Sequence, residues 1–575
     1  MKKQNQLIIQ ETAYRAAKKA GFDLNIEDVH VEKTRMLEHG HFATNIAMFL
    51  SNKSGKRPRD VAKAIIEVLD RSLFTKVEVA GPGFINLWVE QKFYTTECRS
   101  LTGDLRDYLY GSFNGPIKKT MVIDTSHPNI AKPMGVHHLL SAIIGDSIKK
   151  ICKRMGYKVI NDNYLGDWGT QFGKLIYAIR KWGVMSVIEK DPIPELFNLY
   201  VKFHDEAEKD QKLDDFGCQE FKKLEEGDKE NRKLWEFIVQ KSMEKFQVIY
   251  DRLNIDFDVI NGESFYEDKM GEILDKGRKE GIIVNGEGGA WIIKPDDPKD
   301  VPVLVRKSDE ATLYATRDLA RIKYWDKTWH PDLMVNVVDV AQEFYFKQLF
   351  FAESKLGITS AKNVHVSFGR MQFKDAKMST RKGNIILLEK VLDEAEERAY
   401  KLAKEKGLDL SEAEIKELGR IMGIGAIKYN ILSQSRTTNI IFDWDKMLTF
   451  EGNSVPYLMY TAARAKSVIR KSDYNMGNAD SLELKLADNL ETDLVIDFMM
   501  YPDAIRRAAE EFKPNHIANY LYNLAQNFNS FYNAIPILQA DSEELKKSRL
   551  LITACTVKIM EDGLALLGID VPDKM

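Results

Sequence analysis

The stretch TMVIDTSHPNIAKPMGVHHLLSAIIGDSIKKICKRM, residues 120–155, changes its hydrophobic period once and so predicts a strand, a loop and a helix. Residues 121–123 form an apolar run of strand length, and Pro128 and Pro133 then disfavour regular structure. After Gly135, apolar residues recur every three or four positions, as they do on one face of a helix. The start of such a helix presents unpaired amide groups and the positive end of the helix dipole. The stretch therefore predicts a phosphate-binding site.

Basic and imidazole side chains flank this predicted helix start. Lys132 precedes it, and His137 and His138 lie in its first turn. Two neighbouring histidines alone more often cap a surface helix than bind a ligand. A second basic stretch, KMSTRKGN at residues 377–384, supplies further lysines far downstream. The two stretches together favour a polyphosphate site over a simple helix cap.

Longer strings around these two stretches carry a resemblance to a known family. They are SHPNIAKPM (126–134), GDWGTQFG (166–173), ATRDLA (315–320), HVSFG (365–369) and KMSTRKGN. This series resembles arginyl-tRNA synthetase, a class I aminoacyl-tRNA synthetase, nearly from end to end. The resemblance implies an arginine–tRNA ligase that uses ATP and Mg²⁺. Such an enzyme activates L-arginine to arginyl-adenylate and transfers it to the 3′-terminal adenosine of tRNA(Arg), releasing pyrophosphate and AMP.

The bulk composition is that of an ordinary soluble intracellular protein. The 575 residues are 44% hydrophobic and 29% charged, with a formal net charge of −3, so global charge does not indicate a polyanion partner. The four cysteines include no CxxC pair, which argues against a structural zinc site and fits a reducing cytoplasm. No apolar run approaches the length that spans a membrane. The family is mostly monomeric, so we expect a monomer.

The pattern of predicted elements divides the chain into three domains. Residues 1–115 mix helical and strand patterns and resemble the N-terminal additional tRNA-binding domain of the family, with a purely structural module as the alternative. Residues 116–390 alternate strands and helices, which predicts an α/β fold, a Rossmann-like doubly wound parallel sheet. Charged helical segments at about 183–262 predict an insertion with solvated faces.

Residues 391–575 read as amphipathic helices without strands, which predicts an all-α bundle. The bundle resembles the helical anticodon-binding domain of the family. Single-stranded RNA is read by stacking and by contacts to base edges, so basic and aromatic side chains are candidates for anticodon contacts. Those candidates are Arg464, Arg470, Tyr520 and Tyr532, and we expect most of the aromatic residues to belong to the core.

Adenylate formation concentrates negative charge on the α-phosphate and on the leaving pyrophosphate, so fixed cations and helix-terminal amides should carry the catalysis. We assign this role to five basic or imidazole side chains, namely Lys132, His138, His127, Lys377 and Lys382. The resemblance places ATP binding at Gly135, His137, His138, Met378 and Ser379.

The first signature departs from the family pattern. The family usually reads His-x-Gly-His, whereas this chain reads Gly135-Val136-His137-His138. We hypothesise that His127, where the family more often has serine, replaces the missing imidazole. His137 must either turn away from adenine or stack on it, and the sequence leaves both open.

The second signature is altered as well. Thr380 stands where many class I enzymes carry a second lysine. In the family the lost charge comes from the lysine before the first signature, which here is Lys132. Gly383 permits the backbone to close over pyrophosphate.

Specificity for arginine requires carboxylates, because a guanidinium is planar, always charged and rich in donors. Glu263, Tyr314 and Asp318 fall on the guanidinium-binding positions of the family. Asn129 and Gln342 fall on the positions that hold the amino and carboxylate ends of the substrate. Tyr345 replaces the histidine usual three residues after Gln342, which predicts a changed rim of the adenosine site.

Two alternative functions remain open at this point. One is another class I ligase, such as a cysteine-specific enzyme, but the zinc cysteines are missing and the Tyr314/Asp318 pair is present. The other is a catalytically silent tRNA-binding paralogue, which the altered first signature makes conceivable. Retention of the whole predicted substrate pocket argues against it.

Overall fold

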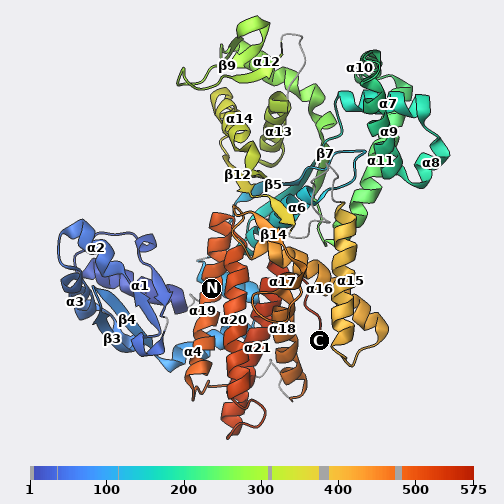
Figure 1. Cartoon of the computed structure of the whole chain (residues 1–575). Coiled ribbons are helices and arrows are strands. Elements are labelled where there is room, and N and C mark those ends of the chain that lie inside the picture. The colour runs from blue at the N-terminus through green and yellow to red at the C-terminus, as the bar shows by residue number, and fades with distance from the viewer. Residues whose placement is uncertain (1–4, 35, 114, 308–313, 374–386, 473–481) are drawn as a thin grey trace. The chain divides into compact units, whose positions relative to one another are not determined.

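The computed structural model describes residues 5–34, 36–113, 115–307, 314–373, 387–472 and 482–575, which form two compact units (Figure 1). The central unit consists of residues 118–402 and 430–447. The terminal unit consists of residues 1–117, 403–429 and 448–575.

A five-stranded parallel sheet forms the framework of the central unit, and this confirms the predicted α/β architecture. Its order is β12 (Lys362–Phe368), β11 (Leu333–Asp339), β5 (Thr120–Ser126), β6 (Lys158–Leu165) and β7 (Val259–Gly262). The chain runs from β5 outward to β7 and then returns to β11 and β12 on the other side of β5. The strand order therefore reverses at β5, and ligands bind at the carboxyl ends of strands at such a switch point.

Helix α6 (Val136–Met155) connects β5 to β6 and packs unusually closely on β5. A Cβ atom placed on Gly145 would lie 2.4 Å from Cβ of Thr125, so only glycine fits at this contact. The apolar run 121–123 is fully buried, as expected for a central parallel strand. The strand, the loop and the helix predicted from residues 120–155 are all present.

Helices α7 to α11 pack on one another and form a separate helical group in Figure 1. They are α7 (Thr170–Trp182), α8 (Met185–Lys190), α9 (Pro192–Ala207), α10 (Lys212–Glu225) and α11 (Lys229–Arg252). At Gly173 a Cβ atom would lie 2.1 Å from the carbonyl oxygen of Gly217, so glycine lets α7 and α10 approach closely.

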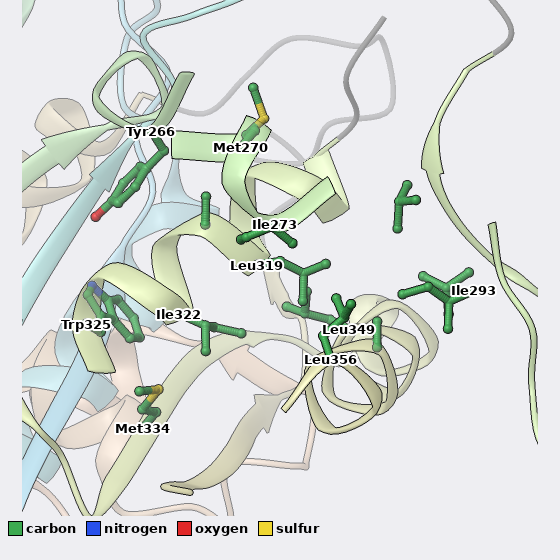
Figure 2. Packing of buried hydrophobic residues seen from close by; sticks show 14 of the residues in the cluster. Tyr266, Met270, Ile273, Ile293, Leu319, Ile322, Trp325, Met334, Leu349 and Leu356 are labelled. Atoms are coloured by element: carbon green, nitrogen blue, oxygen red, sulfur yellow. The ribbon is translucent and has the colours of Figure 1, made fainter. Parts of the chain in front are cut away.

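A hydrophobic core fixes the helix that carries ATRDLA (Figure 2). Trp325 and Leu319 of α13 (Tyr314–Trp329) are fully buried in this core. Other side chains come from the 3₁₀ segment η4 (Glu263–Lys269), α12 (Met270–Lys279) and α14 (Glu343–Leu356). An antiparallel sheet contributes as well, formed by β8 (Ile283–Asn285), β9 (Trp291–Ile293) and β10 (Val303–Arg306).

The terminal unit contains an antiparallel sheet and a helix bundle. The sheet order is β1 (Val31–Lys33), β2 (Phe42–Thr44), β4 (Phe84–Val89) and β3 (Phe74–Ala80). The first helices of the chain are α1 (Asn5–Lys19), α2 (Ile46–Ser54), α3 (Pro58–Val68), α4 (Gln91–Thr102) and α5 (Leu105–Ser112). The bundle contains α18 (Val455–Arg470), α19 (Asn489–Glu511), α20 (Asn515–Ala534) and α21 (Glu543–Leu566).

Three further helices lie in the second half of the chain, namely α15 (Leu388–Glu405), α16 (Glu412–Leu432) and α17 (Trp444–Met447). The prediction that strands are absent after residue 391 is wrong at one place. Residues Ile440–Phe442 form β14, which pairs in parallel with β13 (Met371–Phe373). Three residues are too few to show a period-2 pattern, so only the partner strand reveals this pairing.

Residues from the two ends of the chain contact each other within the terminal unit. Nζ of Lys33 lies 2.7 Å from Oδ1 of Asp497, and Arg99 donates through Nε to the carbonyl of Leu482 at 2.9 Å. Among the described residues, no helix is both long enough and apolar enough to cross a membrane.

Candidate active site

Gly135 is the N-cap of α6, and His138 completes the cap. The Gly135 amide donates to Nδ1 of His138 at 3.1 Å. Burial lowers the pKa of His138 to about 3, and the positive charges of His137 and His127 add to this effect. The ring is therefore neutral at pH 7 and carries its proton on Nε2, because Nδ1 accepts a hydrogen bond. A neutral donor thus stands at the predicted phosphate site.

His137 packs against its neighbour in the first turn of α6. The ring centroids of His137 and His138 lie 3.9 Å apart, with the ring planes tilted by 44°. Partial burial lowers the pKa of His137. Neither of these two imidazoles therefore supplies a positive charge near neutral pH.

The segment KMSTRKGN is predicted to close over the phosphates, and Lys377, Met378, Ser379 and Lys382 all lie outside the described residues. The chain beyond it returns to the helix start. Leu387 forms a β-bridge with Gly135, and the Leu388 amide donates to the carbonyl of Met134 at 2.9 Å. Residues 387 and 388 thus lie beside the first turn of α6.

Backbone and side-chain contacts hold the loop before α6. Asn129 forms a parallel β-bridge with Gly166, and its exposed side chain lies beside that glycine. Ala131 adopts a left-handed conformation with φ of 63°, and its amide donates to Oγ of the buried Ser242 on α11 at 3.0 Å. Nζ of Lys132 lies 4.6 Å from the centroid of the Tyr200 ring on α9.

The two acidic residues predicted to bind guanidinium lie near each other. Glu263 begins η4, and Asp318 lies one turn into α13. Burial raises the pKa of Glu263 to about 7; Arg317 opposes this rise, whereas the negative charges of Asp318 and Asp167 add to it. Nη1 of Arg317 lies 3.1 Å from Oε2 of Glu263. We call Glu263 and Asp318 the acidic slot.

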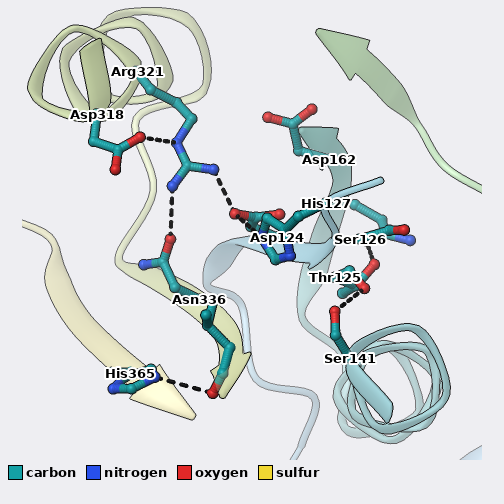
Figure 3. A network of polar contacts seen from close by, with 12 residues as sticks. Asp124, Thr125, Ser126, His127, Ser141, Asp162, Asp318, Arg321, Asn336 and His365 are labelled. Atoms are coloured by element: carbon teal, nitrogen blue, oxygen red, sulfur yellow. Dashed lines mark hydrogen bonds and ion pairs between the residues drawn. The ribbon is translucent and has the colours of Figure 1, made fainter. Parts of the chain in front are cut away.

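A buried arginine links the acidic slot to the carboxyl end of β5 (Figure 3). Arg321 pairs with Asp124 through Nη1 and donates through Nη2 to Asn336 at 3.1 Å, and its Nε lies 3.7 Å from Oδ1 of Asp318. The guanidinium group also lies 4.1 Å from the centroid of the Tyr164 ring. Asp318 of the slot and Asp124 at the end of β5 therefore belong to one ionic network.

His127 belongs to the same network. Its Nε2 lies 2.7 Å from Oδ2 of the fully buried Asp124. Burial alone would raise the pKa of Asp124, but His127 and Arg321 outweigh it and hold the pKa below its ordinary value. The carboxylate is therefore charged and orients the His127 ring.

Tyr345 enters the slot from α14. Its hydroxyl donates to Oδ2 of Asp318. Burial raises the pKa of Tyr345, and the charges of Asp318 and Glu263 raise it further. Tyr345 thus supplies a neutral donor to Asp318.

Tyr314 and Gln342 are exposed positions at element ends. Tyr314 is the first residue of α13 and is 69% exposed, although Asp318, one turn later, is buried. Gln342 is the N-cap of α14 and is exposed at the carboxyl end of β11. Neither side chain is held by the acidic slot in this structure, so both are accessible to a ligand.

Sequence reasoning missed three charged residues of the network, namely Asp124, Arg317 and Arg321. The spacing in ATRDLAR offered a signal, since residues three or four apart share a helix face. Arg317 also donates through Nε to Glu267 at 2.7 Å. Asp167 of GDWG accepts from the amide of Ser264 at 2.9 Å and so fixes the start of η4.

In the described part of the chain, no group of three or more His, Cys, Asp or Glu side chains is arranged to hold a metal ion.

Comparison with protein families gives three matches along the chain. The model described as tRNA synthetases class I (R), catalytic domain, matches residues 105–444. The DALR anticodon binding domain matches residues 458–575, and the arginyl tRNA synthetase N terminal domain matches residues 7–89.

Individual relatives cover nearly the full length. An arginine–tRNA ligase of Fusobacterium nucleatum is 41% identical over 538 residues, which is 93% of each chain. An arginine–tRNA ligase of an Exiguobacterium species is 38% identical over 559 residues, covering 96% of this chain and 97% of the relative.

Solved structures share the fold at lower identity. The arginyl-tRNA synthetase of Plasmodium falciparum superposes with a TM-score of 0.84 at 24% identity, over the full length of both chains. That of Thermus thermophilus gives 0.81 at 22% identity over 99% of each chain. On the family matches and the identities to relatives, the chain belongs to the arginyl-tRNA synthetase family.

Proposed function

We propose that the acidic slot and the first turn of α6 together form the site at which this ATP-dependent arginine–tRNA ligase activates arginine. The observation that carries the proposal is the ionic network joining the slot to β5, in which Asp124, Arg321 and Asp318 are in continuous contact. An amino acid whose cationic end enters the slot would bring its carboxylate toward the helix start, where ATP phosphates are favoured.

In the first step a carboxylate oxygen of arginine attacks the α-phosphorus of ATP, the bond to the bridging oxygen breaks, and pyrophosphate leaves. The residues proposed to stabilise the developing charge are Lys132, the neutral His138 as an Nε2–H donor, and Lys377 and Lys382 of the second signature. His127, oriented by Asp124, is proposed to supply the imidazole that the first signature lacks.

In the second step a terminal ribose hydroxyl of tRNA attacks the carbonyl carbon of arginyl-adenylate, and AMP leaves with the bonding electrons. Gly135, His137, Met378 and Ser379 are proposed to hold the adenosine moiety, as in the family. Mg²⁺ is proposed to accompany ATP, because this ion usually keeps several waters and is held largely by the phosphates of its nucleotide.

Arginine is proposed to be recognised at both ends. Glu263 and Asp318 would pair with the guanidinium, and Tyr314 would cover its plane. Asn129 and Gln342 would hold the amino and carboxylate groups. A neutral side chain in the slot would leave two desolvated carboxylates unpaired, which gives strong discrimination.

The terminal unit contains a cavity that we propose as the anticodon site. A cavity of about 850 Å³ lies among α18, the end of α20 and the chain terminus. Arg464 lies between Tyr460 and Tyr532, 4.7 and 4.8 Å from their ring centroids, and Arg470 also lines the cavity. Tyr520, in contrast, donates its hydroxyl to the backbone of α19 and is part of the core. We propose that the cavity receives unstacked anticodon bases and that residues 1–115 contact the tRNA elbow.

Pyrophosphate exchange into ATP, measured with arginine in the presence and absence of tRNA(Arg), tests the proposed site. We expect exchange that depends on arginine and not on cysteine, and that requires tRNA as is common in the family. No exchange under any condition would instead indicate a silent tRNA-binding protein. The enzyme is further proposed to act as a cytoplasmic monomer, and sedimentation at the charging concentration would test the oligomeric state.

A further inference from the structure

We propose that Tyr200, on helix α9 of the helical group, is a positioning residue for Lys132, an inference that rests on the proposed role of Lys132 at the ATP phosphates. Nζ of Lys132 lies 4.6 Å from the centroid of the Tyr200 ring. This distance is within the range of a cation–π interaction. The helical group α7 to α11 thus contacts the loop before α6 through this aromatic side chain.

The chemistry of this contact suits a lysine that must later bind phosphate. Within the described part of the chain, Lys132 makes no ion pair with a carboxylate. A carboxylate partner would neutralise the ammonium group and compete with ATP. An aromatic face holds the same group with its charge intact, so the lysine can bind phosphate without leaving the ring.

The surroundings fix the ring and the lysine together. The Tyr200 ring packs edge-to-face on His204, with centroids 4.6 Å apart. Burial lowers the pKa of His204, and the charge of Lys174 lowers it further, so His204 stays neutral and does not repel Lys132. The remaining cavity between Lys132, Tyr200 and their neighbours measures only about 10 Å³, which leaves room for at most one water.

A second contact ties the same loop to the helical group. Ala131, next to Lys132, has a left-handed backbone conformation, and its amide donates to Ser242 on α11. The Lys132 amide donates to the carbonyl of Asn129 at 3.3 Å. The backbone therefore sets where the lysine leaves the loop, and Tyr200 selects the rotamers that it adopts. Without the ring, the long side chain regains rotamer freedom that must be lost again when phosphate binds.

The test uses arginine-dependent pyrophosphate exchange by the full-length enzyme with tRNA(Arg) present. Tyr200→Leu should lower kcat by roughly 3- to 30-fold, the range expected for loss of one cation–π contact. Tyr200→Phe should stay within about twofold of the parent enzyme, because the ring face and not the hydroxyl holds the lysine. The KM for arginine should be unchanged in both variants, since the slot is untouched.

A double-mutant cycle separates positioning from general damage. In a Lys132→Ala background, Tyr200→Leu should cause no further loss. Tyr177→Leu is the matched control, because Tyr177 on α7 also carries a lysine, Lys181, whose Nζ lies 5.3 Å from its ring centroid and which has no proposed role at the phosphates. It should leave kcat of exchange near the parent value. If Tyr200→Leu does not fold, Tyr200→Gln serves as the second variant without a ring.

Three results would overturn the inference. Full exchange activity in folded Tyr200→Leu, with exchange abolished in Lys132→Ala, would remove Tyr200 while leaving the proposed function intact. Losses that multiply in the double variant would show that Tyr200 acts independently of Lys132. Unchanged exchange in Lys132→Ala would refute the role of the lysine, and the inference would fall with it.

Discussion

Glu263 should impose a pH dependence on arginine recognition that Glu263→Gln removes. Burial raises the pKa of Glu263 to about 7, so the group is protonated below that pH and ionised above it. Only the ionised form complements a guanidinium. The kcat/KM for arginine should therefore fall about tenfold between pH 8 and pH 6, because this parameter reports the pKa of the free enzyme.

The substitution itself has a magnitude that follows from the contacts. Glutamine keeps the shape of Glu263 but removes the charge, and hydrogen bonds to charged groups contribute about 1.5–3 kcal/mol. Loss of one such contact corresponds to roughly a 10- to 150-fold decrease in kcat/KM for arginine at pH 8. The variant should show no step near pH 7.

The assay is aminoacylation of tRNA(Arg) at subsaturating arginine, with ATP and tRNA saturating, across pH 6 to 8.5. Glu267→Gln is the matched control, since Glu267 lies in the same η4 segment and pairs with Arg317 from the other side. It should retain the pH step. A Glu263→Gln enzyme with parent kcat/KM, or with the same step near pH 7, would show that Glu263 does not contact the substrate.

Four further substitutions probe the network and the framework. In initial-rate kinetics, Asp318→Asn should raise the KM for arginine at least 30-fold, and Tyr345→Phe about 5- to 10-fold. The double variant should be no worse than Asp318→Asn alone, because Tyr345 acts through the Asp318 carboxylate. Additive effects of the two substitutions would show that Tyr345 acts independently of Asp318. His127→Ala should lower the rate of arginine activation in single-turnover assays, and an unchanged rate would refute its role as the replacement imidazole. Gly145→Ala should reduce the free energy of unfolding by about 1–2 kcal/mol in urea titrations, because the cost of overpacking against Thr125 exceeds the gain in helix propensity. A more stable variant would show that α6 can shift away from β5.

Strong periodicity allowed the sequence to predict many elements closely. The strand around residues 121–123 and the helix after Gly135 are present as β5 and α6, because the hydrophobic period changes sharply between them. The strand β14 was missed because its three residues pair with β13, about 70 positions earlier. Local pattern cannot reveal a pairing that only tertiary structure brings about.

Some residues of the candidate site could likewise be predicted from the sequence, and others could not. Glu263 and Asp318 were placed from motif resemblance, and the structure brings them near each other. The pair of Asp124 with Arg321 joins residues 197 positions apart and has no local signature beyond the helical spacing of Arg321. The Tyr345 hydroxyl reaches Asp318 from another helix, and Lys132 rests on a ring of the helical group. Long-range polar contacts of this kind follow from the packing of α13, α14 and α9, which no sequence period encodes.

The most direct test of the account is a crystal structure of the enzyme with a non-hydrolysable arginyl-adenylate analogue. We predict that the guanidinium lies within hydrogen-bonding distance of both Glu263 and Asp318, and that the phosphate lies at the first turn of α6 beside His138. An analogue whose guanidinium contacts neither acid, or whose phosphate lies away from that helix start, would contradict the proposed site.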